Sequence, residues 1–195
     1  RAEGSRGRPA AAPAGTPMNH DRYDDTYVAA ILNESKVIAM VGASANINRP
    51  SYFAMKYLLG KGFRVIPVNP SLAGKEILGQ KVAASLAEIN EKVDMVDVFR
   101  NSEAALEVVR EAIALKDKLG LKVIWMQLAV RNDIAAAEAE AAGLKVVMNR
   151  CPKIEYGRLS GEIGWAGVNA GMVSSKRPQL GTVGVQNHVI RPRST

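Results

Sequence analysis

Residues 37–51 read Val-Ile-Ala-Met-Val-Gly-Ala-Ser-Ala-Asn-Ile-Asn-Arg-Pro-Ser. An apolar, β-branched run ends at Gly42, a polar loop follows, and Pro50 opens a helical pattern. This order predicts a strand, a tight turn and a helix N-terminus. Unpaired N–H groups and partial positive charge at that helix end suit a phosphate, and Arg49 adds a forked donor for its oxygens. The loop nevertheless lacks two of the three glycines of the dinucleotide fingerprint.

Four further apolar runs alternate with helical patterns along the chain. The expected strands are 36–41, 63–68, 93–98, 121–126 and 144–148, and the expected helices are 24–33, 50–60, 85–90, 102–118 and 131–142. Each strand is short and almost continuously apolar, which is typical of strands covered on both faces. The alternation predicts a doubly wound, Rossmann-like α/β domain of three layers with a parallel five-stranded sheet. A ligand is expected at the carboxyl ends of the strands.

Composition and cysteine content exclude several classes of protein. The chain of 195 residues is 47% hydrophobic and 23% charged, as in globular proteins. No apolar run approaches the roughly 20 residues of a membrane span, so no membrane partner is expected. The single cysteine, Cys151, rules out an internal disulfide and fits a reducing compartment, from which we expect a cytoplasmic location. No Cys/His cluster indicates a metal site.

The net charge of +7 lies mostly at the two ends of the chain. Residues 1–17 carry +2 and residues 176–195 carry +4, which leaves +1 for everything between them. A nucleic-acid-binding protein usually has a basic face on the folded domain itself. The charge distribution therefore argues against a nucleic-acid partner.

Three regions are expected along the chain. Residues 1–23 are poor in large apolar side chains and are expected to be a disordered extension. Residues 24–175 form the domain, in which the Gly-rich stretch 158–175 is interpreted as a closing segment. Residues 176–195 are interpreted as a basic tail.

The end of the second expected strand helps to choose between phosphate ligands. A NAD-binding domain places an acidic residue there to hold the ribose hydroxyls. This chain reads Val-Ile-Pro-Val-Asn-Pro over 65–70 and has no acid until Glu76, whereas Lys75 stands just before it. The Asn69 amide can bind ribose or adenine. Lys75 and the missing acid favour a phosphorylated ribose, which fits NADP or the 3′-phosphate of coenzyme A (CoA).

Four short motifs together resemble a known family. They are Val-Gly-Ala-Ser at 41–44, Arg-Pro-Ser at 49–51, Pro-Val-Asn-Pro at 67–70 and Cys-Pro at 151–152. In this combination the chain resembles the small single-domain CoA-binding proteins, which are similar to the N-terminal domain of the succinyl-CoA synthetase alpha subunit. The resemblance covers roughly residues 24–175. The loop around Gly42 would not be specific without the other motifs.

The resemblance implies a set of CoA-binding residues. They are Gly42, Ala43, Ser44, Arg49, Pro50, Asn69, Pro70, Lys75, Phe99, Arg100, Asn101, Met126 and Gln127. Gly42, Ala43, Ser44 and Arg49 would hold the pyrophosphate, beside Pro50 at the start of the expected helix. Asn69 and Pro70 would border the adenosine, and Lys75 would meet the 3′-phosphate. The last five would line the path of the pantetheine arm.

No catalytic centre is indicated. The ligases carry a phosphohistidine on a second domain, whereas this chain has only His20 and His188, both outside the expected core. Cys151, with no histidine nearby in sequence, is interpreted as a small buried hydrophobe. We therefore expect a non-catalytic carrier, sensor or partner subunit that binds CoA or an acyl-CoA, as a homodimer or with another protein. An NADP-dependent oxidoreductase and an accessory subunit of an acyl-CoA ligase remain as alternatives.

Overall fold

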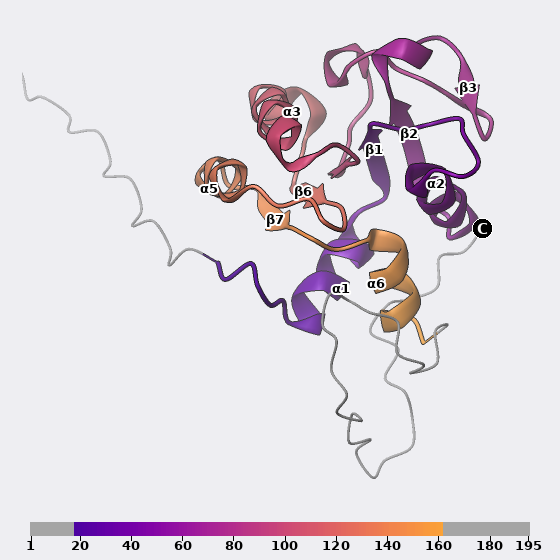
Figure 1. Cartoon of the computed structure of the whole chain (residues 1–195). Helices are drawn as coiled ribbons and strands as arrows, with labels where there is room; N and C mark the ends of the chain where they lie inside the picture. Colours follow the sequence, from indigo (N-terminus) through magenta and orange to yellow (C-terminus); the bar gives the residue numbers. More distant parts are fainter. Residues whose placement is uncertain (1–17, 162–195) are drawn as a thin grey trace, which may run out of the picture.

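A computed structural model describes residues 18–161 of the chain (Figure 1). Its helices are α1 (Asp25–Glu34), α2 (Pro50–Gly60), η1 (Pro70–Leu72), η2 (Leu86–Glu88), α3 (Ser102–Ala114), α4 (Lys116–Leu119), α5 (Asp133–Ala141) and α6 (Pro152–Leu159). Its strands are β1 (Val37–Val41), β2 (Arg64–Val68), β3 (Glu76–Ile77), β4 (Gln80–Lys81), β5 (Met95–Val98), β6 (Val123–Met126) and β7 (Lys145–Val147). The expectations for residues 1–17 and for the segments after 161 lie outside this range.

Five of the strands form one parallel sheet in the order β2-β1-β5-β6-β7. Helices α3 and α5 pack together on one face, and α1, α2 and α6 cover the other (Figure 1). The order turns back between β1 and β5, so ligands are expected above that point. The doubly wound, three-layered α/β fold is therefore confirmed.

Alternate residues of β5 point into the two halves of the core. Val96 and Val98 join the apolar cluster under α3 and α5. Met95 faces the cluster under α1, α2 and α6. Asp97 follows the same alternation onto that second face, where Trp125 of β6 is its register partner. The sheet thus buries a carboxyl group between two apolar strands.

Two expected helices differ from what the structure has. The helix expected at 85–90 is the short 3₁₀ turn η2, in which the Glu88 carboxylate accepts the Ala84 N–H. The helix expected at 102–118 stops at Ala114, because Leu115 leaves the helical conformation (φ −97°, ψ 3°) before α4 begins. Both errors arise where side-chain contacts and local backbone angles override an apolar period.

The turn η1, the β3–β4 hairpin and helix α6 were not expected. The hairpin of β3 and β4 turns at Leu78 and Gly79, whose φ angles of 49° and 73° are those of a type I′ turn. Helix α6 starts with Pro152 at its first position. Proline is common at that position of a helix, but Pro152 was interpreted only as part of the loop after the last expected strand.

Residues around the start of α1 contact the edge strand β7 and the residue that follows it. The Tyr23 hydroxyl accepts the Met148 N–H at 2.8 Å, and the Tyr27 hydroxyl donates to the Val146 carbonyl at 3.2 Å. Residues 18–23, which we placed in the N-terminal extension, thus belong to the described part of the structure. None of the described helices has the length and apolar character needed to cross a membrane.

Candidate functional site

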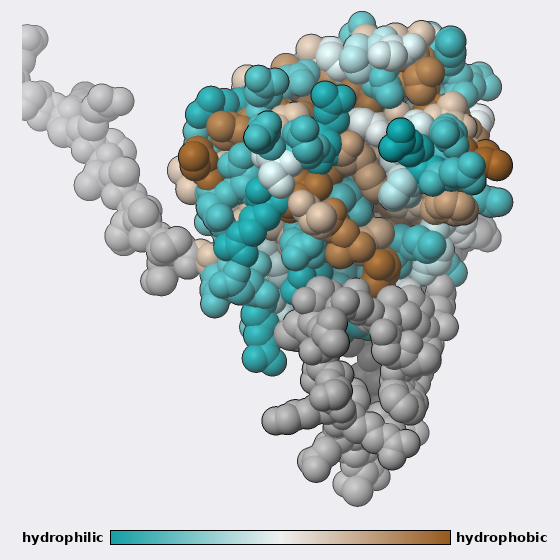
Figure 2. Space-filling view, in the orientation of Figure 1, coloured by the Kyte–Doolittle hydropathy of each residue, from teal (hydrophilic) through white to brown (hydrophobic). Residues whose placement is uncertain are grey.

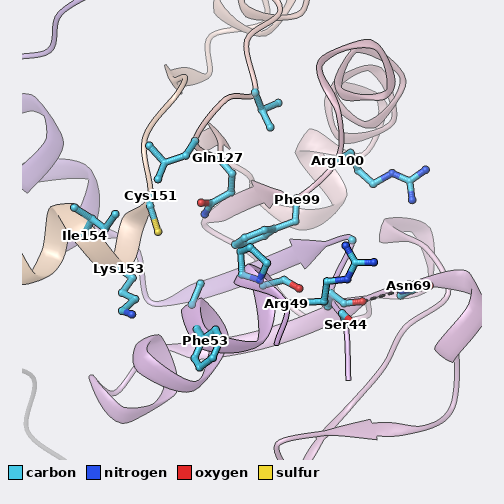
Figure 3. A pocket seen from close by; sticks show the side chains of 17 residues that line it. Ser44, Arg49, Phe53, Asn69, Phe99, Arg100, Gln127, Cys151, Lys153 and Ile154 are labelled. Atoms are coloured by element: carbon cyan, nitrogen blue, oxygen red, sulfur yellow. Dashed lines mark hydrogen bonds between the residues drawn. The ribbon is translucent and has the colours of Figure 1, made fainter. Parts of the chain in front are cut away.

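A cavity of about 650 Å³ opens above the carboxyl ends of β1, β2, β5 and β6 (Figure 3). Nine of the expected binding residues line it: Gly42, Ala43, Ser44, Arg49, Pro50, Asn69, Phe99, Arg100 and Gln127. They come from separate parts of the chain, and the parallel sheet brings them to one edge. Its volume is in the ordinary range for a cofactor site.

Gly42 follows β1 in a backbone conformation that residues with a side chain rarely adopt. Its φ is +87°, and a Cβ built on it would lie 2.3 Å from the Phe99 carbonyl oxygen. Its N–H donates to the Val68 carbonyl at 2.9 Å. The glycine therefore lets the turn after β1 lie directly against the turn after β5, so that both border the cavity.

The loop between β1 and α2 is fixed by short hydrogen bonds. Asn69 Nδ2 donates to the Ala43 carbonyl at 2.7 Å, the contact drawn in Figure 3. Ser44 Oγ accepts the Asn46 N–H at 3.2 Å. The N-cap of α2 is Arg49, whose side chain does not cap the helix, and the first turn of α2 has no acidic residue. The positive end of this helix is therefore open toward the cavity.

Charge in the cavity is of one sign. Its lining includes Arg49, Arg100 and Lys153 and, within the part of the chain that the structure describes, no aspartate or glutamate. The guanidinium groups of Arg49 and Arg100 are drawn beside the Ser44 loop and the turn after β5 (Figure 3). No salt bridge involves either arginine within residues 18–161. A lining of this charge favours anions over cations.

Two exposed apolar side chains also border the cavity. Phe53 is 51% exposed and Leu128 is 42% exposed. Few large apolar residues are as open among residues 18–161, and polar residues predominate on the face shown in Figure 2. The cavity therefore offers apolar contact at its mouth beside its cationic loop.

Three buried polar groups lie together at the β6 side of the cavity. Gln127 and Cys151 line it and are 5% and 9% exposed. Gln127 Nε2 donates to the two carboxylate oxygens of Asp97 at 2.8 and 3.1 Å. Burial raises the pKa of Asp97 to about 7, against the lowering effect of that hydrogen bond. Burial likewise raises the pKa of the Cys151 thiol, while the Ile154 N–H lowers it.

Sequence reasoning missed part of this group. Asp97 was not among the expected site residues, and Cys151 was interpreted only as a small hydrophobe. An aspartate inside an apolar strand was the available signal, because a buried carboxyl needs a partner. The identity of that partner depends on the register of β5 and β6, which no local pattern gives.

Four expected binding residues lie outside the cavity lining. Pro70 begins η1 and Lys75 is exposed at the start of the β3–β4 hairpin. Asn101 caps α3 by accepting the Ala104 N–H at 2.8 Å. Met126 is fully buried under α3 and α5, because it points to the opposite face of the sheet from Gln127.

The model of the CoA binding domain family matches residues 36–157. The chain belongs to this family. Among curated proteins it is similar to the uncharacterized protein YneT of Bacillus subtilis (strain 168), at 36% identity over 126 residues, which are 65% of this chain and 89% of the relative. The resemblance stated from the four motifs is therefore confirmed.

Solved structures share the fold. A hypothetical protein from Pyrococcus horikoshii OT3 is 40% identical with a TM-score of 0.65, over 71% of this chain and 93% of that chain. A Thermus thermophilus protein is 34% identical with a TM-score of 0.65, over 70% and 98%. The dinucleotide-forming acetyl-coenzyme A synthetase 1 of Ca. Korarchaeum cryptofilum (apo form) is 23% identical with a TM-score of 0.51, over 61% of this chain and 27% of that chain, a likeness in fold alone.

Proposed function

We propose that the cavity binds CoA or an acyl-CoA, and that the protein acts as a non-catalytic carrier, sensor or partner subunit. One observation carries the proposal: the cavity at the switch point of the sheet is lined by three cations and by no carboxylate of the described residues. CoA carries a pyrophosphate and a 3′-phosphate, so its charge matches that lining. The CoA binding domain family of the chain supports the same ligand.

The pyrophosphate would lie at the start of α2. The open helix end supplies backbone N–H groups, and Arg49 precedes its first residue. Gly42 lets the backbone come close to the phosphates without a side chain between them. These three features lie within one loop, which makes the loop the anchor of the ligand.

The adenosine would lie over the β2 side and the pantetheine arm over the β6 side. Asn69 follows β2 and donates a hydrogen bond to the Ala43 carbonyl, so its position is fixed before the ligand arrives. Lys75 is exposed and lies between η1 and β3, at the start of the neighbouring hairpin. Gln127 follows β6 and closes the other end. A ligand with a phosphorylated ribose and a long apolar arm suits this arrangement.

The competing ligand is NADP, which also carries a phosphorylated ribose. An NADP-dependent oxidoreductase needs a proton donor beside the nicotinamide. The titratable groups at the β6 end are Asp97, Cys151 and Lys153, and Asp97 lies behind Gln127 rather than in the lining. An accessory subunit of an acyl-CoA ligase would use the same CoA site, so ligand binding does not exclude it.

Calorimetric titration of the full chain with CoA, dephospho-CoA, NADP and NAD tests the proposal. CoA is expected to bind most tightly. Arg49→Ala should weaken CoA binding about tenfold to a hundredfold, the range for a lost charge-assisted contact. Arg110→Ala is the matched control, since Arg110 pairs with Glu138 on the α3–α5 face and should leave CoA binding unchanged. Tighter binding of NADP than of CoA would replace the proposal with the oxidoreductase.

A second pair of variants tests the 3′-phosphate contact. Lys75→Ala should weaken CoA but leave dephospho-CoA unaffected, because only CoA carries the phosphate. Lys81→Ala, on β4 of the same hairpin, is the control. If wild-type protein binds CoA and dephospho-CoA equally, Lys75 has no such role.

A further inference from the structure

The pair Asp97–Gln127 sits where the reactive end of the ligand would lie. In Figure 3 the carboxamide of Gln127 lies between Cys151 and Phe99, facing the cavity. Gln127 is held by its backbone as well, with its N–H on the Val98 carbonyl at 3.3 Å and its carbonyl accepting the Val130 N–H at 2.9 Å. The backbone of Gln127 is therefore fixed, while its side-chain amide can take either of two orientations related by a flip of Oε1 and Nε2.

Asp97 decides which orientation the amide takes. An ionised carboxylate only accepts hydrogen bonds, so Nε2 of Gln127 must face it and Oε1 is left toward the cavity. Among residues 18–161, Oε1 forms no hydrogen bond that would hold it otherwise. A protonated carboxyl can donate instead, and the amide can then turn so that Oε1 accepts from Asp97 and Nε2 faces the cavity.

We infer that Asp97 and Gln127 form a proton-controlled switch that presents an acceptor to the cavity when Asp97 is ionised and a donor when it is protonated. The inference rests on the proposed function, because it needs the pantetheine end of CoA beside Gln127. Free CoA ends in a thiol, whose S–H is a weak donor. An acyl-CoA ends in a thioester, whose carbonyl oxygen accepts. The switch would thus read whether the ligand carries an acyl group.

Gln127 is the hydrogen-bonding partner of the buried Asp97 carboxyl group. Asp97 is fully buried, and its carboxyl oxygens accept only from Gln127 within the described residues. The flanking strands β1 and β6 carry no titratable side chain. The titratable and charged groups on the elements around this face are Asp25, Tyr27, Glu34, Arg49, Tyr52, Lys56, Tyr57, Arg100, Arg150, Cys151, Lys153, Glu155, Tyr156 and Arg158. The buried carboxylate of Glu155 is paired with Arg158. The charge of Asp97 also contributes to the raised pKa of the Cys151 thiol.

The switch falls within a usable pH range. Since burial raises the pKa of Asp97 to about 7, the carboxyl is mostly protonated at pH 6 and mostly ionised at pH 8. At lower pH the Gln127 amide therefore turns its Nε2 donor toward the cavity, which favours binding of the thioester of an acyl-CoA. At higher pH the Oε1 acceptor faces the cavity, which favours binding of the thiol of free CoA.

The test is the ratio of the dissociation constants of acetyl-CoA and CoA, measured by calorimetry on the full chain from pH 6 to pH 8. Titration of the phosphates is common to both ligands and cancels in this ratio. The ratio is expected to rise with pH by about threefold to tenfold, the range for one exchanged hydrogen bond. A ratio that stays constant in wild-type protein would overturn the inference while leaving CoA binding, and so the proposed function, intact.

Three variants separate a positioning role from a structural one. In Asp97→Asn the new amide can pair with Gln127 in either orientation, so the ratio should be independent of pH. Gln127→Leu removes both polar atoms and should also flatten it, which gives a second readout if Asp97→Asn does not fold. Asp94→Asn is the matched control, because Asp94 immediately precedes the same strand at its opposite end and pairs with Lys122. It should keep the wild-type profile, and loss of the profile there would also count against the switch.

Discussion

Gly42 gives the sharpest test of how the cavity is built. Replacing it with alanine puts a Cβ at 2.3 Å from the Phe99 carbonyl oxygen, a backbone atom that cannot rotate away. The substitution also forces an L-residue to φ +87°. The strained φ costs about 1–2 kcal/mol, and a contact that pushes the backbone apart typically adds about 1–3 kcal/mol. We expect Gly42→Ala to lower the free energy of unfolding by about 2–5 kcal/mol.

Two other glycines separate these contributions. Gly74 has φ +77° with no atom within 4 Å of a built Cβ, so Gly74→Ala should cost only the φ strain. Gly60 ends α2 without a positive φ and with open space around it, so Gly60→Ala should be neutral or slightly stabilising. Urea unfolding of the three variants should therefore order them as Gly60, Gly74 and Gly42 from least to most destabilised. Equal losses at Gly42 and Gly74 would refute the close approach of the two turns.

Three further outcomes follow from the same contacts. Asp97→Asn should remove one contribution to the pH dependence of stability. Because the folded pKa of Asp97 is raised, its contribution is full below pH 4 and is lost as pH rises toward 7. The difference in the free energy of unfolding between wild type and variant, measured in urea from pH 4 to 8, should therefore change in favour of the variant as pH rises. Asn69→Ala should lower the free energy of unfolding by about 1–2 kcal/mol, since both the bond to Ala43 and the cap of η1 are lost. Arg64→Ala breaks a pair with Glu91 whose side chains are 53% and 42% exposed, and thermal unfolding should show a loss below about 1 kcal/mol.

The sheet could be predicted because its signal is local. Each strand is a short apolar run between turn residues, and burial on both faces leaves that run almost uninterrupted. The observed strands begin and end within two residues of those expected. Helix α6 was missed for the opposite reason: its sequence, Pro-Lys-Ile-Glu-Tyr-Gly-Arg-Leu, has little apolar period. Glu155 is buried in it against Arg158, a pairing that no period shows.

The candidate site likewise has one part that local sequence predicts and one part that depends on tertiary structure. The loop from Gly42 to Pro50 is continuous in sequence, so its role could be inferred from the order of its residues. Asp97, Gln127 and Cys151 come from three places along the chain and meet only through the pairing of β5 with β6 and the return of the chain after β7.

The alternation of side chains along the strands explains both the error at Met126 and the position of Gln127. Consecutive residues of a strand point to opposite faces, so of two neighbours only one can reach the cavity. Met126 joins the core under α3 and α5, whereas Gln127 follows Trp125 onto the face that carries Asp97. The register of Asp97 with Trp125 therefore determines that the amide two residues later meets the buried carboxyl. A shift of one residue between β5 and β6 would move Gln127 to the other face and leave the buried Asp97 carboxyl without a partner. The register that brings Gln127 to the cavity is therefore also the one that allows an aspartate inside this sheet.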